Sequence, residues 1–373
     1  MPPKGKGGTP RTKTSKGAEK KPVTRKQSST DTCAPKTLPT QTLTRTKSFF
    51  NLAIQPEYQA LVTQFVIMTL DKTMLQLRTE FSIHKRVADK ADTVAFLQNQ
   101  PKNRYKDVPC LDNCRVKLTG VENDYIHANY VSTPKSDKRF ICCQAPITET
   151  QADHWRMVVQ EKVEHMLMLC NFIEAKPKCT EYFPTPAVRE KTFGPFTITL
   201  ISCDKIKWEG TSTAVVMMST LEIKKDGVKV HECTHYHWID WPDRGVPKPD
   251  LAPFELLSRM AGSTMPILIH CSAGIGRTGA LVLLQYTLEA MNKGQQVKSM
   301  ADFLLKVREQ RANSVQTDAQ YVYVHMMLLN YFQKEGLIAD RTLQKKFKDH
   351  FAPNYHKFAE AAETKLDDKP KKK

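Results

Sequence analysis

The chain has 373 residues, enough for one large folded domain or two modest ones. Its formal net charge of +17 would suit a nucleic-acid binder, because clustered Lys and Arg neutralise phosphates. Residues 1–50, however, hold twelve Lys or Arg and only two acidic residues, and residues 365–373 add five more lysines. Most of the basicity therefore lies at two polar ends, so no specific nucleic-acid partner is expected. These ends could still contact anionic surfaces.

Cysteine usage and hydropathy indicate the compartment. The ten cysteines lack the spacing of a disulfide framework, and the polar stretch that follows Met1 lacks the pattern of a secretory signal. No segment approaches 18 consecutive apolar residues, so no transmembrane segment is expected. We therefore expect a soluble, cytoplasmic protein with reduced thiols.

Composition divides the chain into three segments. Residues 1–55 are basic, rich in Ser, Thr and Pro, and poor in large apolar residues, which predicts a disordered extension. Apolar residues spaced at three and four begin near Glu57 and predict one or two helices before Asn103. We expect a folded domain over residues 56–335 and a charged C-terminal helix or tail over residues 336–373.

Strands and helices are expected within the folded domain. Alternating or β-branched runs predict strands at Phe196–Ser202, Thr213–Lys224 and Val228–Trp238, and Asp226-Gly227 is a strong hairpin turn. A short apolar run, Met265–His270, predicts a buried strand that leads through a Gly-rich loop into a helix. The predicted helices that follow are Thr278–Ala290, Ala301–Arg311 and Thr317–Phe332. This mixture indicates an α/β fold.

The loop between the buried strand and the helix has a Cys-x5-Arg spacing, from Cys271 to Arg277. Gly274 and Gly276 would permit backbone angles that turn successive N–H groups inward, at the positive end of a helix. Such a cradle fits a phosphate dianion and lowers the pKa of a cysteine thiol. A structural turn with an inert cysteine would require several residues to coincide by chance.

Each residue type in this loop suits phosphoryl transfer. The Cys271 thiolate can attack phosphorus, and the Arg277 guanidinium can hold two phosphate oxygens and follow the charge that develops on them. Thr278 can donate a hydroxyl hydrogen bond to the sulfur when it leaves.

The segment His270–Gly279 resembles the signature loop of the tyrosine-specific protein tyrosine phosphatases. The resemblance covers about residues 57–332 in one copy, as in the single-domain, non-receptor members of this family. Together with the basic leader, it indicates a non-receptor enzyme of nematode type. It implies a highly twisted mixed β-sheet flanked by α-helices on both faces, with the Cys-x5-Arg loop between strand and helix. It also implies phosphate binding by the loop residues Ser272, Ala273, Gly274, Ile275, Gly276 and Arg277, with support from His270.

Two further segments match this family. Trp241–Pro247 resembles its mobile acid loop, in which Asp243 would be the general acid and then the base, while Trp241 serves the hinge. Val315–Gln320 resembles the loop that positions the attacking water, with Gln316 as the main residue and Gln320 as a second candidate.

Substrate recognition follows from the same resemblance. Asn103–Val108 resembles the phosphotyrosine recognition loop, so Tyr105 would stack on the substrate ring and Asp107 would accept a hydrogen bond from the substrate backbone. Because Tyr105 deepens the pocket, phosphoserine would not reach Cys271. Glu174 lies where the family has the acid that orients the signature Arg277, although the alignment around it is loose.

The sequence therefore predicts a hydrolase of signal transduction, which dephosphorylates phosphotyrosine on proteins through a phosphocysteine intermediate. No metal or organic cofactor is expected. The alternating set His231, Cys233, His235 and His237 is set aside as a metal site, because neighbours on one flat strand diverge too widely to enclose an ion.

Two other classes remain as alternatives. One is a phosphotyrosine-binding pseudophosphatase, which would keep the cradle without turnover. Such proteins usually lack the acid, the Arg or the Gln, whereas Asp243, Arg277 and Gln316 are all present. The other is a nucleic-acid-binding protein, which would depend on the basic ends alone.

Overall fold

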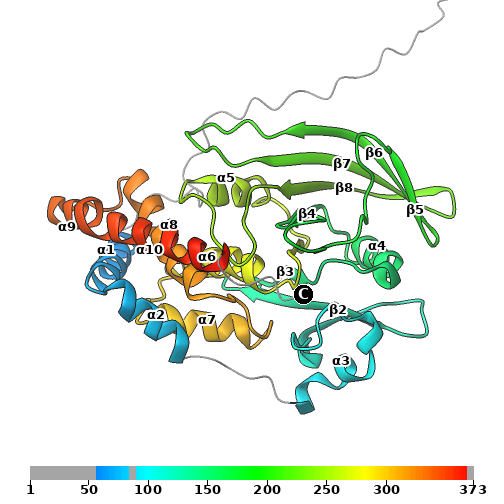
Figure 1. Ribbon diagram of the computed structural model, residues 1–373, viewed down its shortest axis with the longest axis horizontal. Helices are drawn as coiled ribbons and strands as arrows, with labels where there is room; N and C mark the ends of the chain where they lie inside the picture. Colours follow the sequence, from blue (N-terminus) through cyan, green and yellow to red (C-terminus); the bar gives the residue numbers. More distant parts are fainter. Residues whose placement is uncertain (1–55, 84–89, 368–373) are drawn as a thin grey trace, which may run out of the picture. The chain divides into compact units, whose positions relative to one another are not determined.

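The computed structural model describes residues 56–83 and 90–367, and all of them belong to one unit of the chain, Thr46–Lys373 (Figure 1). The predicted extension of residues 1–55 lies outside the described residues and stays a prediction.

A mixed β-sheet organises the described residues. Its strands are β1 (Arg115–Lys117), β2 (Tyr125–Thr133), β3 (Ser136–Cys143), β4 (His165–Met168), β5 (Glu190–Phe193), β6 (Phe196–Lys205), β7 (Val216–Lys225), β8 (Val228–Trp238) and β9 (Ile267–His270). Within this part of the chain the nine strands follow the order β1-β2-β3-β9-β4-β8-β7-β6-β5. The four central strands β3, β9, β4 and β8 are parallel, and the outer pairs are antiparallel.

Helices flank this sheet. They are α1 (Pro56–Leu70), α2 (Met74–Ile83), α3 (Val94–Gln98), α4 (Gln151–Gln160), α5 (Ala252–Arg259), α6 (Gly276–Asn292), α7 (Met300–Arg308), α8 (Asp318–Lys334), α9 (Arg341–Lys346) and α10 (Ala352–Asp367). Helix α6 contacts β2 and β9, whereas α4 contacts β5 and β6. The predicted fold class, a mixed sheet flanked by helices, is confirmed. None of the helices in the described ranges has both the length and the apolar composition needed to cross a membrane.

The core of the fold is the β9–loop–α6 unit. All four residues of β9 are buried, and α6 is buried from Gly276 to Met291. A helix that is buried on every side must be apolar all round, which explains the run of Leu, Val and Ala along α6. The predicted strand-loop-helix unit is thus present, and its burial fixes the loop between the two elements.

Parallel central strands bring separate segments to one edge of the sheet. The carboxyl ends of β9, β4 and β8 lead respectively into residues 271–276, into the segment that contains Glu174, and into residues 239–251. Because these strands are parallel neighbours, the three segments meet at the same edge, which is where ligands bind in open α/β sheets.

The predicted hairpin is also confirmed. β7 pairs antiparallel with β8 through Asp226 and Gly227, whose φ angles are 50° and 82°. Positive φ at both central residues is the signature of a type I′ turn, which Asp-Gly favours.

The sequence analysis did not predict strands β1 to β5 or helices α4 and α5, which the structure contains. Strand β2 is buried over most of its length, and the second half of β3 is buried on both faces. A strand buried on both faces does not alternate between apolar and polar residues, so its period of two is lost.

The C-terminal segment packs against the rest of the unit. Helix α9, a π-helical turn at Phe347–Phe351 and α10 follow one another, and α10 contacts α2 and α8. Phe347, Phe351 and Tyr355 lie four residues apart and are at most 4% exposed. The segment therefore adds to the core, although the predicted boundary at residue 336 stays a prediction.

The Tyr355 ring should contribute measurably to stability. Tyr355→Ala should lower the free energy of unfolding by about 3 kcal/mol, because it removes a buried ring and leaves a cavity. Tyr355→Phe should cost little, since the buried Tyr355 hydroxyl has no hydrogen-bond partner in the described structure. Urea denaturation measures both variants, with His356→Ala, an exposed neighbour, as the control. Equal losses for the Ala and Phe variants would contradict this assignment.

Candidate active site

The Cys-x5-Arg loop folds tightly between β9 and α6. Gly274 has a φ of 67°, and a Cβ atom at this position would lie 1.9 Å from the Cys143 carbonyl oxygen. Only glycine fits both constraints. Gly276 begins α6 without a positive φ, so the prediction that it turns its N–H inward does not depend on left-handed backbone angles and stays a prediction. Gly276 provides space, since a Cβ there would lie 3.1 Å from the Gln316 side chain.

The Cys271 thiol is buried but has a lowered pKa. Burial alone raises the pKa, and three other influences outweigh it: the Arg277 charge, hydrogen bonding from Thr278, and the Gly274 backbone N–H. The buried Thr278 hydroxyl makes no other hydrogen bond among the described residues. The loop therefore favours a thiolate at Cys271, the form that acts as a nucleophile.

Arg277 is buried and held on three sides. Its Nη1 and Nη2 donate to the Oε1 and Oε2 atoms of Glu174 at 2.6 and 3.0 Å. Nη1 also donates to the Trp241 carbonyl oxygen at 2.9 Å, and Nη2 lies 3.4 Å from Asp243 Oδ1. Hydrogen bonding to Glu174 and the nearby Cys271 raise the pKa of Arg277 against the opposing effect of burial. These contacts fix the position and orientation of the Arg277 guanidinium beside Cys271.

The predicted acid loop lies over the Cys271 loop. Trp241 is 1% exposed, packs against Trp238 and Tyr323, and anchors the start of the loop. Two residues later, Asp243 pairs with Arg277 and, at 2.5 Å, with Lys178. The structure thus brings the predicted acid and the predicted nucleophile to one site.

Lys178 was not singled out from the sequence. It stands between the Glu174 segment and Tyr182, and its ion pair spans 65 residues of the chain to Asp243. Its backbone carbonyl accepts a hydrogen bond from Ser272 Oγ at 2.9 Å. The only available signal was the Lys-Cys dipeptide inside a stretch that already resembled the family.

A small pocket gathers most of the predicted site residues. Its volume is about 70 Å³. Its walls are formed by Tyr105, Asp107, Val108, Lys178, Asp243, Arg244, Cys271, Ser272, Ala273, Gly276, Arg277, Gln316 and Gln320. Tyr105 contributes through a hydrogen bond between its hydroxyl and Ser272 Oγ at 2.8 Å. Val108 and Arg244 are further residues that were not predicted.

Six predicted residues do not line this pocket: Gly274, Ile275, Thr278, Glu174, His270 and Trp241. The Ile275 side chain is 3% exposed and belongs to the core, and the Gly274 carbonyl oxygen faces Arg311. His270 is fully buried behind the loop, where it contacts the Tyr182 hydroxyl at 2.7 Å, and burial lowers its pKa to about 3. Any contribution of Ile275 or Gly274 to phosphate binding would come from the backbone.

Gln316 and Gln320 occupy different environments. Gln316 is exposed and lines the pocket. Gln320 is 1% exposed, and its Oε1 accepts from the Gln316 and Thr317 backbone N–H groups in a capping box that begins α8. Its Nε2 has no hydrogen-bond partner in the described structure. Gln320 thus offers a buried donor at the pocket wall.

Arg311 supports the loop from below and was missed as a functional residue. It is fully buried and donates to the carbonyl oxygens of Ala273 at 3.0 Å and Gly274 at 3.1 Å. It also donates to Asn129 Oδ1 at 2.9 Å. In the sequence Arg311 is only the end of a predicted helix, so nothing local reveals this role.

The alternating histidines of β8 serve the core. His231 and His237 contact the backbone carbonyls of Val163 and Cys170, and His235 contacts the Tyr182 hydroxyl. Within the described ranges, no group of three or more His, Cys, Asp or Glu side chains is placed to hold a metal ion.

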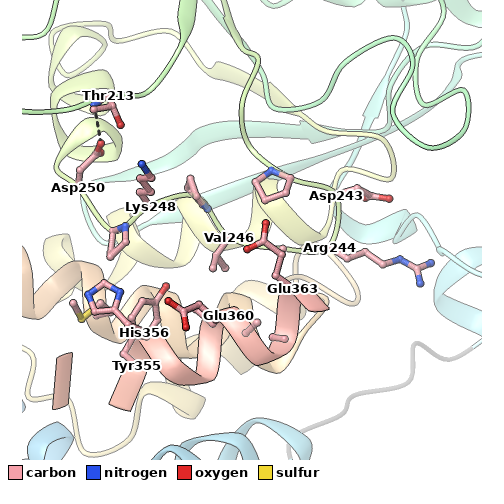
Figure 2. A pocket seen from close by; sticks show the side chains of 18 of the residues that line it. Thr213, Asp243, Arg244, Val246, Lys248, Asp250, Tyr355, His356, Glu360 and Glu363 are labelled. Carbon is pink, nitrogen blue, oxygen red and sulfur yellow. Dashed lines mark hydrogen bonds between the residues drawn. The ribbon is translucent and has the colours of Figure 1, made fainter. Parts of the chain in front are cut away.

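A second, larger cavity lies beside the acid loop. Its volume is about 1220 Å³, and residues 242–250 form one wall while α10 forms another (Figure 2). Glu360 and Glu363 of α10 line this cavity, but Cys271 does not. Open space therefore separates the predicted acid loop from α10.

The chain belongs to the protein-tyrosine phosphatase family. The family model described as protein-tyrosine phosphatase matches residues 99–330, more than half of the chain. The chain is 34% identical to receptor-type tyrosine-protein phosphatase zeta of Rattus norvegicus, over 67% of this chain and 11% of that protein. It is 32% identical to tyrosine-protein phosphatase non-receptor type 12 of Homo sapiens, over 64% and 31% of the two chains. The match thus spans less than a third of these two relatives.

Solved structures agree with this membership. The catalytic domain of human protein tyrosine phosphatase non-receptor type 18 superposes with a TM-score of 0.57 at 30% identity. That match covers 68% of this chain and 96% of the solved one. The predicted nematode type stays a prediction.

The lowered pKa of Cys271 can be tested by alkylation. Because the thiolate reacts, the midpoint of Cys271 alkylation by iodoacetamide should lie below pH 9.0. Arg277→Ala removes the charge that offsets burial and should move the midpoint upward, whereas Arg277→Lys should restore part of the depression. Mass spectrometry of each cysteine peptide measures this, with buried Cys142, whose pKa is raised to about 12, as the internal control. If neither substitution changes the midpoint pH, Arg277 does not lower the pKa of Cys271.

The buried ion pair between Arg277 and Glu174 should matter more to stability than an exposed one. Glu174→Gln should lower the free energy of unfolding by about 3 kcal/mol, because it removes the bidentate and most buried counter-charge of the Arg277 guanidinium. Glu181→Gln breaks a pair in which Glu181 is 61% exposed, and should cost less than about 1 kcal/mol. Denaturant titration compares the two variants. Similar losses in the free energy of unfolding would contradict a larger contribution from the buried Arg277 pair.

Proposed function

We propose that the protein hydrolyses phosphotyrosine on proteins through a phosphocysteine intermediate. The observation that carries this proposal is the convergence, at one pocket, of a cysteine with a lowered pKa, a fixed guanidinium and the Asp243 carboxylate. PTPN18 has been solved in complex with HER2 phosphopeptides. Its likeness to this chain supports a phosphotyrosyl protein as the substrate.

The first step transfers the phosphoryl group to sulfur. The Cys271 thiolate attacks phosphorus, the S–P bond forms, and the bond from phosphorus to the tyrosyl oxygen breaks. Arg277 and the loop N–H groups hold the equatorial oxygens, while Asp243 donates its proton to the leaving oxygen. A bound phosphate would compete with Asp243 for Arg277, which would free the carboxyl group to face the leaving oxygen.

The second step returns the enzyme to its starting state. A water held by Gln316, with Gln320 Nε2 as a second donor, attacks the phosphorus of the phosphocysteine. Asp243 accepts the proton from this water, the S–P bond breaks, and inorganic phosphate and the Cys271 thiolate are released. Thr278 can donate to the departing sulfur. No step requires a metal ion or an organic cofactor.

Specificity for tyrosine rests on the pocket wall. Tyr105 is held by Ser272, and its ring would line the path of the substrate ring to Cys271. Asp107 is exposed at the same pocket, where it can accept from a peptide backbone. A shorter phosphoseryl side chain would then leave its phosphate above the thiolate.

The cellular setting stays a prediction from the sequence. A cytoplasmic location and a role in signal transduction are consistent with relatives named as non-receptor phosphatases. Contacts between the basic ends and anionic surfaces concern residues outside the described part of the chain.

Turnover of matched peptides tests the proposal. The wild type should release phosphate from a phosphotyrosyl peptide and not from the phosphoseryl peptide of the same sequence, and Cys271→Ser should be inactive. Asp243→Ala should lower kcat by about a hundred- to ten-thousandfold while binding is retained, because only the proton transfer is lost. Asp204→Ala, an exposed aspartate on β6, is the matched control. Absence of turnover in the wild type sinks the enzyme proposal, and comparable phosphoserine cleavage sinks the role of Tyr105.

A further inference from the structure

Arg244 adopts an unusual backbone conformation directly after the proposed acid. Its φ is 58°, in the left-handed region, where a side chain is disfavoured by about 1 kcal/mol or more. Glycine would adopt this conformation without the cost, but glycine stands at the next position, Gly245, and not at 244. A side chain held at such a position beside reacting groups points to a function for the side chain.

The surroundings of Arg244 leave its charge available. The residue is exposed and lines the Cys271 pocket together with Gln316. Its carbonyl oxygen accepts from the Thr317 hydroxyl at 3.2 Å, which fastens this point of the acid loop to the start of α8. The guanidinium has no ion pair or hydrogen bond with any residue in the described ranges.

Arg244 also lines the larger cavity together with Glu360 and Glu363 of α10, but among the described residues it forms no ion pair with either. Figure 2 shows the Arg244 side chain extending away from Glu360 and Glu363, in the same direction as the Asp243 side chain. Lys248, on the same loop, lies on the other side of the larger cavity and does not line the Cys271 pocket. Arg244 is therefore a cation of the acid loop that faces the mouth of the pocket.

A peptide seated in this pocket would pass two distinct groups. Asp107, on the recognition loop, suits the backbone of the peptide, whereas the Arg244 fork suits a carboxylate. We propose that Arg244 is a specificity-determining residue that pairs with an Asp or Glu side chain adjacent to the phosphotyrosine. This inference rests on the proposed function, since it names the class of peptide that the same site prefers.

Binding to an inactive protein tests the pairing without turnover. In a Cys271→Ser background, fluorescence anisotropy measures the Kd of three phosphotyrosyl peptides, with Glu before the phosphotyrosine, Glu after it, or Gln at both positions. At least one Glu peptide should bind about fivefold more tightly than the Gln peptide, the size expected for a partly exposed ion pair. The preference should shrink when salt is raised from about 0.05 to 0.3 M.

Variants assign the preference to one residue. Arg244→Gln should remove the difference between the Glu and Gln peptides, Arg244→Lys should keep part of it, and the control Lys248→Gln should leave it unchanged. A preference that survives Arg244→Gln, or one that only Lys106→Gln abolishes, overturns the proposal. Equal binding of all three peptides by the parent protein overturns it as well.

Kinetics on the active protein separate this inference from the proposed function. Arg244→Gln should raise KM for the preferred Glu peptide about fivefold with little change in kcat, because the pair forms equally in the ground and transition states. A fall in kcat without a change in KM would place Arg244 in loop closure instead and overturn the specificity role. If no peptide is turned over, the proposed function fails, while the binding experiment still decides the pairing of Arg244.

Discussion

The bidentate contact between Arg277 and Glu174 is the interaction on which the site depends. The Arg277 guanidinium belongs to the first turn of α6, Glu174 to the segment after β4, and the Trp241 carbonyl that it also contacts to the segment after β8. One buried cation thus joins three segments that lie far apart in the sequence. A buried guanidinium is stable only when its hydrogen-bonding groups are occupied and its charge is balanced, so each segment has a defined position.

The parallel centre of the sheet makes this arrangement possible. Strands β9, β4 and β8 are parallel neighbours, so their carboxyl ends bring the Cys271 loop, the Glu174 segment and the predicted acid loop to one edge. The loops need only short extensions from buried strands to meet. Arg311 then holds the floor of the Cys271 loop through two of its carbonyl oxygens, which limits how far the cradle can deform. The Cys271 loop is therefore supported from below by Arg311, and the predicted acid loop lies above it.

Features with a local physical cause could be predicted from the sequence. The Asp226-Gly227 turn, the buried strand before Cys271 and the helix after it each follow from short-range rules, and the structure contains all three. Lys178 and Arg311 could not be found in this way, because their partners lie 65 and 37 residues distant and only the folded sheet brings them together. Gly276 is a different case. The sequence analysis singled out this glycine, but the lack of room for a side chain beside Gln316 depends on tertiary packing and could not be predicted.

The cysteines show that position rather than residue type decides reactivity. Cys142 on β3 and Cys271 are both buried, and burial disfavours a thiolate in each. At Cys142 the charge of Arg311 offsets only part of this effect, and the pKa is raised to about 12. At Cys271 the nearby guanidinium acts together with hydrogen bonds from Thr278 and Gly274, and the pKa falls. Since Glu174 and the Trp241 carbonyl hold that guanidinium in place, the reactivity of the thiol depends on the junction of three segments. The chemistry of the loop is thus a property of the whole sheet edge and not of the Cys-x5-Arg spacing alone.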